Sequence, residues 1–426
     1  MVFTGFFDTL MVGKVGTEEL AAAGISNSIF FFVAIFPMGV TMAFATIVGT
    51  LQGKNKTKSY HLLARDAFII TLALAAFAMV SLWLFTDTFA LFKQTDEVAA
   101  LAIPYLRLLM WSIAPMLIFF FAKNICDGFS YTISGMVITI TALALNILLN
   151  WVFIFGHWGS EAYGLNGAGY ATIISRMYLA LGMLFFMFKS SKVDIHISDF
   201  IRSFIRMKRI YFYNKIFTIG FPTGLQYFFE IAAFAAAAVM AGWWGAKELA
   251  AHNLAITLAS LTYMFASGIA AGSSICVAKA YGNKNAENVR LYGINGHKIG
   301  ITIMLLFAII FWLFDVELAS MFSKDKDVIK MGAHLLFLAA IFQLGDGIQA
   351  VSVGLLRGIT DLNIPSFIVF VCYWVVAMPA GYFLSKYTAE GHSMHGVNGI
   401  WIGLSIGLTL SAIALSLRFY ALLRKS

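Results

Sequence analysis

The segment IFTIGFPTGLQYFFEIAAFAAAAVMAGWWGA, residues 216–246, contains one charged residue, Glu230, close to its centre. A bilayer core is about 30 Å thick, so an apolar run of roughly 20 residues can cross it as a helix. Placing an acidic group at the centre of such a helix costs about 2.5–3.5 kcal/mol of insertion free energy. The segment therefore predicts a transmembrane helix that carries a carboxylate for a functional reason.

Comparable apolar runs recur along the whole chain. The chain has 426 residues, of which 60% are hydrophobic and 12% charged, whereas soluble proteins contain about 25% charged residues. We expect an all-α polytopic membrane protein of about twelve transmembrane helices, with no soluble domain. The first run, residues 1–13, is too short to span a bilayer, so we expect a truncated first helix that begins part-way across the membrane.

The basic residues indicate the topology. The chain carries a net charge of +8, and most of its 29 Lys and Arg residues fall in loops on one side if the N-terminus is cytoplasmic. Cytoplasmic loops carry the excess of Lys and Arg in membrane proteins, so both termini are assigned to the cytoplasm. The positive charge is thus a topology signal and implies no nucleic-acid partner. Arg176 is an exception, because it lies within a predicted helix.

The sequence repeats itself. VGKVGTEELAA (12–22) matches AGWWGAKELAA (241–251), and GLNG (164–167) matches GVNG (396–399) at a nearly equal offset. A constant offset over six helices predicts two pseudo-symmetric six-helix lobes in parallel orientation, with substrate bound near the midplane.

We assign residues 1–188 to an N-lobe of helices 1–6 with an incomplete helix 1, and residues 216–426 to a C-lobe of helices 7–12. Residues 189–215 form a predicted cytoplasmic linker. This linker is basic and partly amphipathic, so we expect it to lie on the anionic headgroups of the bilayer.

Two further acids lie in apolar surroundings. Asp346 is the only formal charge between Lys330 and Arg357, and Asp8 lies in the short first segment. The alternative role, hydrogen bonding between helices, contributes only about 0.6 kcal/mol on average, which is small against the insertion cost. We therefore predict that Glu230, Asp346 and Asp8 bind a coupling cation and the substrate. Arg176 either snorkels to the interface or pairs with an acid.

Neutral oxygen donors accompany these acids. Asn146 and Asn150 lie one turn apart on one predicted helix, and Thr172 follows on the next. Together with a carboxylate they suit a hard cation such as Na⁺, although packing between helices would explain them as well. Pro37 lies in the middle of a predicted helix and is a candidate hinge or kink. We expect no cofactor, and no metal beyond Na⁺ at these residues.

The chain resembles the multidrug and toxic compound extrusion (MATE) family, in its NorM branch. The resemblance rests on FDTLMVGKVG (7–16), FFEIAAF (228–234), FQLGDGIQAVSVGLLRGITDLNIP (342–365) and GVNGIWIGL (396–404), in family order. It implies two six-helix lobes and a monomeric antiporter, not an enzyme, in the bacterial cytoplasmic (inner) membrane. It also implies export of cationic amphiphilic compounds in exchange for Na⁺ or H⁺.

By position, Glu230 and Asp346 resemble the family's C-lobe cation-site carboxylates, and Asp8 resembles the N-lobe carboxylate. Phe342 stands where NorM-type members carry a tyrosine, so we expect H⁺ coupling at the C-lobe acids and any Na⁺ site in the N-lobe. Members of the family have a complete first helix, so the short first segment of this chain is a second departure from the family pattern. The alternative function is a flippase for a lipid-linked oligosaccharide or related precursor, which predicts a more basic cavity.

Overall fold

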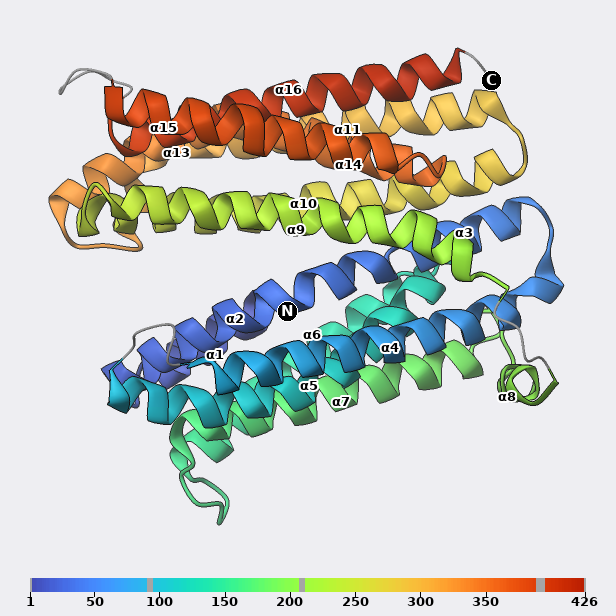
Figure 1. Ribbon diagram of the computed structural model, residues 1–426, viewed down its shortest axis with the longest axis horizontal. Helices are drawn as coiled ribbons and strands as arrows, with labels where there is room; N and C mark the ends of the chain where they lie inside the picture. The colour runs from blue at the N-terminus through green and yellow to red at the C-terminus, as the bar shows by residue number, and fades with distance from the viewer. Residues whose placement is uncertain (1, 90–94, 207–210, 388–394, 425–426) are drawn as a thin grey trace. The chain divides into compact units, whose positions relative to one another are not determined.

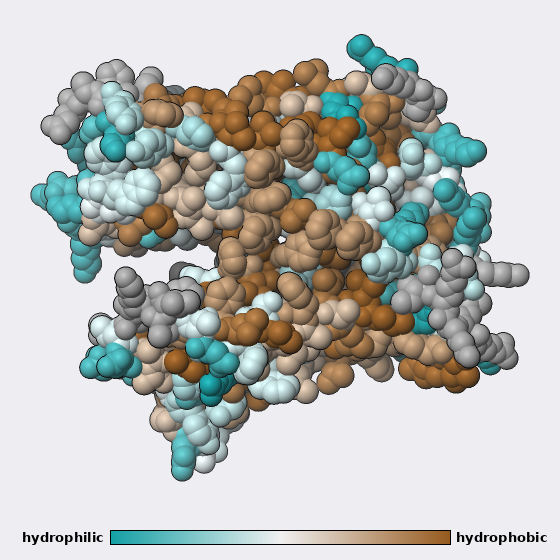
Figure 2. Space-filling view, in the orientation of Figure 1, coloured by the Kyte–Doolittle hydropathy of each residue, from teal (hydrophilic) through white to brown (hydrophobic). Residues whose placement is uncertain are grey.

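The computed structural model describes residues 2–89, 95–206, 211–387 and 395–424, and the elements in these ranges are helices (Figure 1). Eleven of the described helical segments are long and apolar enough to cross a bilayer, and α1 (Val2–Val12) is shorter. Figure 2 shows hydrophobic surface over the middle of the helices and hydrophilic residues towards their ends. The predicted all-α polytopic membrane fold is confirmed.

The chain divides into two compact units, Met1–Gly224 and Leu225–Ser426. This boundary falls within α9 (Tyr213–Gly242), beyond the predicted end of the linker at residue 215. The lobe boundaries assigned from the sequence therefore stay a prediction, and the two units are described separately.

The first unit is built around α5, which packs against α2, α4 and α7. Its core contains the buried side chains of Phe30, Leu106 and Met116. Its elements after α1 are α2 (Thr17–Thr41), α3 (Ala43–Gly53), η1 (Thr57–Ser59), α4 (Tyr60–Asp87), α5 (Asp96–Gly128), α6 (Ile133–Phe155), α7 (Gly164–Lys189), α8 (Ile197–Arg206) and the start of α9.

The second unit is built around α13, which packs against α10, α11 and α16. Trp401, Leu404 and Tyr373 belong to its buried core. Its elements after α9 are α10 (Ala246–Gly282), α11 (Ala286–Leu313), α12 (Asp315–Ser320), α13 (Lys326–Gly358), α14 (Asn363–Phe370), the π-helical segment η3 (Val371–Ala377), α15 (Met378–Tyr387) and α16 (Val397–Leu423).

The sequence repeat extends to the backbone. The central helices α5 and α13 have 33 residues each. Asn55 and Lys284 follow α3 and α10 with φ of 52° and 57°, and Ser130 and Thr360 follow α5 and α13 with φ of 64° each. Left-handed backbone is uncommon outside glycine, so its recurrence at matching places indicates that the two units share one chain path.

The helix that contains Pro37 is interrupted. α2 ends at Thr41, α3 begins at Ala43, and the N–H of Met42 between them bonds to the carbonyls of Gly39 and Val40. Proline lacks the N–H of a regular helical turn, but the break lies more than one turn beyond it. The Asn124 amide on α5 donates to the Thr41 hydroxyl at 3.1 Å beside the break. Pro37 is therefore close to an irregularity, and its role as a hinge stays a prediction.

Part of the predicted linker forms α8, and its residues 207–210 lie outside the described ranges. In Figure 1 α8 is seen end-on while α4, α5 and α7 run across the view, so α8 lies across these helices. Two buried residues of α4 hold it there: Arg65 donates to the Ser203 carbonyl at 2.9 Å and to Asp66 at 2.6 Å. Asp66 in turn accepts the backbone N–H groups of Tyr211 and Phe212 at 2.7 and 2.8 Å.

Candidate functional site

The two acids of the second unit come from neighbouring helices. Glu230 on α9 is 7% exposed and Asp346 on α13 is 4% exposed, and the two carboxyl groups interact electrostatically. Gly347 follows Asp346, and a Cβ atom at Gly347 would lie 2.5 Å from the Met304 side chain of α11. The absence of a side chain at Gly347 therefore lets α13 approach α11 closely at the level of Asp346.

Glu230 has two polar neighbours that the sequence analysis missed. Gln349, one turn after Asp346 on α13, donates its amide to Glu230 Oε1 at 3.2 Å and to the Tyr373 hydroxyl at 3.3 Å. Tyr373 is fully buried in the π-helical segment η3, and such segments are frequent at functional sites. The spacing of Gln349 from Asp346 was a readable signal, whereas the position of Tyr373 depends on tertiary packing.

Phe342 lies in apolar surroundings one turn before Asp346. Its ring packs edge-on against Phe234 and Trp401, with centroids 6.1 and 5.7 Å apart. The hydroxyl that is linked to Glu230 through Gln349 comes from Tyr373, on a different helix. The oxygen that the sequence analysis found lacking at position 342 thus has a counterpart at position 373.

The structure brings three predicted residues of the first unit into contact. Asp8 on α1 is 7% exposed, and its Oδ1 accepts the Asn150 amide at 2.5 Å. The same amide nitrogen donates to Asn146 Oδ1 at 3.2 Å. Asn146 and Asn150 are one turn apart on α6 and fully buried, so α6 presents both amides toward the carboxylate of α1.

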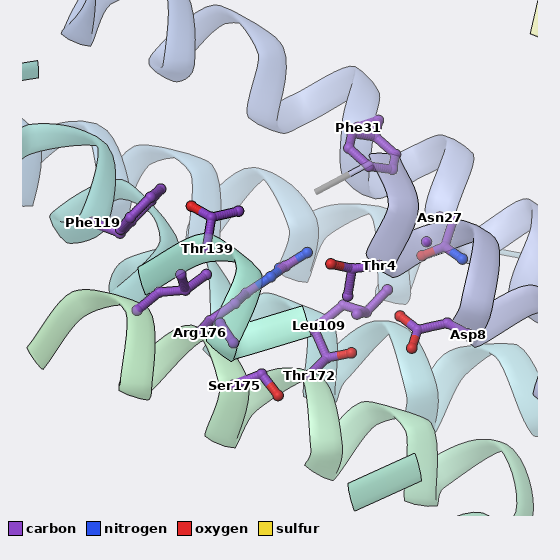
Figure 3. Close-up of a pocket in the computed structure, with 13 residues that line it drawn as sticks. Thr4, Asp8, Asn27, Phe31, Leu109, Phe119, Thr139, Thr172, Ser175 and Arg176 are labelled. Atoms are coloured by element: carbon purple, nitrogen blue, oxygen red, sulfur yellow. The ribbon is translucent and has the colours of Figure 1, made fainter. Parts of the chain in front are cut away.

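A pocket of about 40 Å³ lies beside Asp8, lined also by Asn27, Thr172, Ser175 and Arg176 (Figure 3). A volume of this size is large enough for an ordered water molecule or a small cation. Within the described ranges, three buried oxygens here have no hydrogen-bond partner: Asn150 Oδ1, Thr172 Oγ1 and Ser175 Oγ. Carboxylate, amide and hydroxyl oxygens are the ligands that hard cations prefer, so the pocket has the donor set for Na⁺. Pro37 is not among the residues that line it.

Arg176 extends into this same pocket from α7 (Figure 3). Its Nη1 donates to the Ser112 hydroxyl of α5 at 2.5 Å, and its guanidinium lies 4.4 Å from the centroid of the Phe30 ring. It interacts electrostatically with Asp8, but these two described residues form no ion pair within 4 Å. Arg176 therefore does not snorkel, and it faces the acid across the pocket.

Two helical units that repeat one chain path, each with a buried carboxylate beside hydrogen-bonding groups, define a membrane transporter rather than an enzyme. The model of the MatE family matches residues 1–152 and 222–383. The chain belongs to this family, and the resemblance to MATE transporters of the NorM branch is confirmed.

Relatives of the chain are named multidrug resistance proteins. It is 32% identical to the multidrug resistance protein NorM of Aliivibrio fischeri over 423 residues, which cover 99% of this chain and 90% of the relative. It is 30% identical to the multidrug resistance protein MdtK of Proteus mirabilis over 430 residues, covering 99% and 92% of the two chains.

Solved structures share the fold. A crystal structure of a MATE protein in a bent conformation superposes with a TM-score of 0.89 at 21% identity, covering all of this chain and 92% of the other. An outward-facing multidrug resistance MATE transporter superposes with a TM-score of 0.88 at 22% identity, covering 100% and 93% of the two chains.

Proposed function

We propose that this chain is a secondary active multidrug efflux antiporter that exports cationic organic compounds in exchange for Na⁺ or H⁺. The observation that carries the proposal is the pair of buried carboxyl groups, Glu230 and Asp346, in one helical unit. An acid inside a membrane protein is costly and marks an ion or substrate path. The names of the NorM and MdtK relatives support multidrug efflux.

The mechanism uses competition for these carboxyl groups. A coupling cation and a cationic substrate both need a negative oxygen, so binding of one displaces the other. Gln349 holds Glu230 at 3.2 Å and is in contact with Tyr373, so both residues orient the carboxylate and supply further oxygens. Alternating access then exchanges the two ligands across the membrane.

The first unit offers a candidate Na⁺ site made of Asp8, Asn146, Asn150 and Thr172. The amide nitrogen of Asn150 donates a hydrogen bond to Asp8, and Asn150 Oδ1 has no hydrogen-bond partner among the described residues. With a cation between the two side chains, rotation of this amide would turn Oδ1 toward the ion. The carboxylate, the amide oxygens and the Thr172 hydroxyl would then coordinate Na⁺.

We place the protein in the bacterial cytoplasmic (inner) membrane as a monomer, with both termini cytoplasmic. The excess of Lys and Arg in loops assigned to one side supports this orientation. Its substrates would be cationic amphiphilic compounds, which combine a charge for the carboxylates with an apolar body for the helices.

The test is ethidium efflux from proteoliposomes with imposed Na⁺ or H⁺ gradients. Glu230→Gln and Asp346→Asn keep size and hydrogen bonding but cannot carry a negative charge. Each is expected to lower gradient-driven efflux at least tenfold while the protein still inserts and purifies. Glu161→Gln, a change at an exposed loop acid, is the matched control and is expected to transport as the parent does.

Normal efflux by both acid variants would refute the proposed role of the carboxylates. Absence of gradient-driven efflux by the parent, together with movement of a fluorescent lipid-linked oligosaccharide between leaflets, would instead favour the flippase. The pocket beside Asp8 pairs its one lining arginine with an acid, so it lacks the net positive charge that a site built for pyrophosphate would need.

A further inference from the structure

Arg176 is a charged group that the mechanism above does not use. It lies in the pocket beside Asp8, where a cation exchanger would be expected to keep negative charge only. Its guanidinium has a fixed place, because the Ser112 hydroxyl accepts from Nη1 at 2.5 Å and the Phe30 ring lies 4.4 Å away. Cation–π contact stabilises a cation over an aromatic face, so the side chain is held in the pocket as a cation.

The charges of the pocket offset each other. The charged residues among its lining are Asp8 and Arg176, and they interact electrostatically without a direct ion pair. A lone charge in a weakly solvated site is costly, and an opposite charge nearby reduces that cost. A free cation that binds Asp8 must also overcome repulsion by Arg176, and this repulsion is weakly screened inside a membrane protein.

We propose that Arg176 is a tethered cation that lowers the affinity of the Asp8 pocket for free Na⁺. The oxygens at Asn150, Thr172 and Ser175 would suit a cation, and Arg176 supplies the positive charge from within the chain. This inference rests on the proposed function, since it concerns a cation site of an exchanger. Arg176 is thus a residue that determines ion specificity, and it shifts the exchange of cations toward Glu230 and Asp346.

The test measures binding of ²²Na⁺ to the full chain in nanodiscs. The background is the Glu230→Gln/Asp346→Asn double variant, so that the second-unit acids contribute nothing. Arg176→Met removes the charge and keeps the apolar stem, and Arg176→Lys keeps the charge. Arg176→Met is expected to tighten Na⁺ binding at least tenfold, because the repulsion between unit charges about 10 Å apart at an effective dielectric constant near 20 already has this size and grows at shorter distance. Arg176→Lys is expected to bind as the background does.

The tighter Na⁺ binding of Arg176→Met must depend on Asp8. Adding Asp8→Asn to Arg176→Met is expected to abolish it. A second variant, Arg176→Ala, leaves space for a free guanidinium ion. Guanidinium chloride at millimolar concentration is expected to weaken its Na⁺ binding, whereas choline chloride at equal ionic strength is not. Arg176→Ala also keeps the proposal testable if Arg176→Met does not fold.

Unchanged or weaker Na⁺ binding in both neutral variants would overturn the proposal, as would a gain that persists with Asp8→Asn. The binding assay needs no transport, so it separates this inference from the proposed function. Tighter binding without drug efflux would leave the inference intact and remove the antiporter. Drug efflux by the parent without tighter Na⁺ binding in the Arg176 variants would overturn the inference and leave the antiporter in place.

Discussion

Tyr373 and Gln349 connect the buried acid of α9 to two other helices. The Gln349 amide lies 3.2 Å from Glu230 and 3.3 Å from the Tyr373 hydroxyl. A hydrogen bond in such a network contributes about 1 kcal/mol, and more when its loss leaves a buried group unpaired. The orientation of Glu230 therefore depends on a hydroxyl that enters from η3.

We expect Tyr373→Phe to weaken binding of the coupling cation about fivefold, which corresponds to one lost hydrogen bond. The measurement is the Na⁺ or H⁺ concentration that gives half-maximal ethidium efflux. Tyr382→Phe is the matched control, because the Tyr382 hydroxyl contacts the exposed Lys386 of α15. Equal effects of the two changes would show that the Tyr373 hydroxyl has no part in coupling.

Residue-level features were predictable from the sequence only in part. Charge isolation identified Glu230, Asp346 and Asp8, because one carboxylate within an apolar run is visible without a structure. The Asn146 and Asn150 pair was also visible, since residues four apart share a helix face. Tyr373 was not, because an aromatic residue in an apolar run resembles its neighbours until packing places it beside Gln349.

At the scale of elements, α8 is an amphipathic helix with an uncovered apolar stripe. Ile197, Ile201 and Ile205 follow one another at helical spacing and are 54%, 53% and 79% exposed. Phe200, at the edge of the same face, packs against Phe68 of α4. A helix that lies across a transmembrane bundle with such a stripe is typical of the membrane interface.

A nitroxide at Ile201→Cys is therefore expected to show lipid-like accessibility, high to oxygen and low to a water-soluble nickel complex. Asp199→Cys, on the opposite face of α8, is the control and should show the reverse. Both labels are placed in a Cys276→Ser background, because Cys276 is the exposed cysteine and Cys126 and Cys372 are buried. Water-like accessibility at position 201 would contradict an interfacial α8.

The attachment of α8 gives a second prediction. Arg65 and Asp66 form a buried ion pair, and loss of one partner of such a pair costs about 3–5 kcal/mol. Arg65→Met is expected to lower the melting temperature and to expose residues near α8 to limited proteolysis. Arg202→Met removes an exposed pair with Asp199 at 3.7 Å and should change neither, since exposed pairs contribute about 0–1 kcal/mol.

The sequence predicted the helices better than their irregularities. The apolar runs predicted the helices, because bilayer thickness fixes helix length. The matching ELAA segments predicted that these helices form two sets. Pro37 predicted a kink, and the helix breaks beyond it at Met42. The π-helical turn of η3 has no compositional signature, and it shifts Tyr373 relative to a regular helix.

In the whole molecule, we expect the two units to bind different coupling ions. We expect H⁺ to act at Glu230 and Asp346, because a proton needs only one carboxylate, and beside these acids Tyr373 supplies a single hydroxyl while Phe342 supplies none. Na⁺ stripped of water needs several oxygens, which the Asp8 pocket supplies. Arg176 opposes Na⁺ there, so Na⁺ stimulation of the parent should be weak.

A Na⁺ titration of efflux without a pH gradient tests this division. Stimulation is expected to be weak in the parent, lower in Asn150→Ala and higher in Phe342→Tyr, which adds a hydroxyl one turn before Asp346. Asn253→Ala, at an exposed position of α10, is the control. Strong stimulation of the parent that survives Asn150→Ala would assign Na⁺ to the second unit instead.

The left-handed residues at matching places in the two units make each unit an internal reference for the other. Asn55 with Lys284, and Ser130 with Thr360, keep one backbone shape with different side chains. The bend of the chain is therefore the same at matching places in the two units, although the residue that forms it differs. Glycine adopts this conformation without strain. Substitution by glycine at these four positions is therefore a suitable place to begin engineering a more heat-resistant protein for crystallisation.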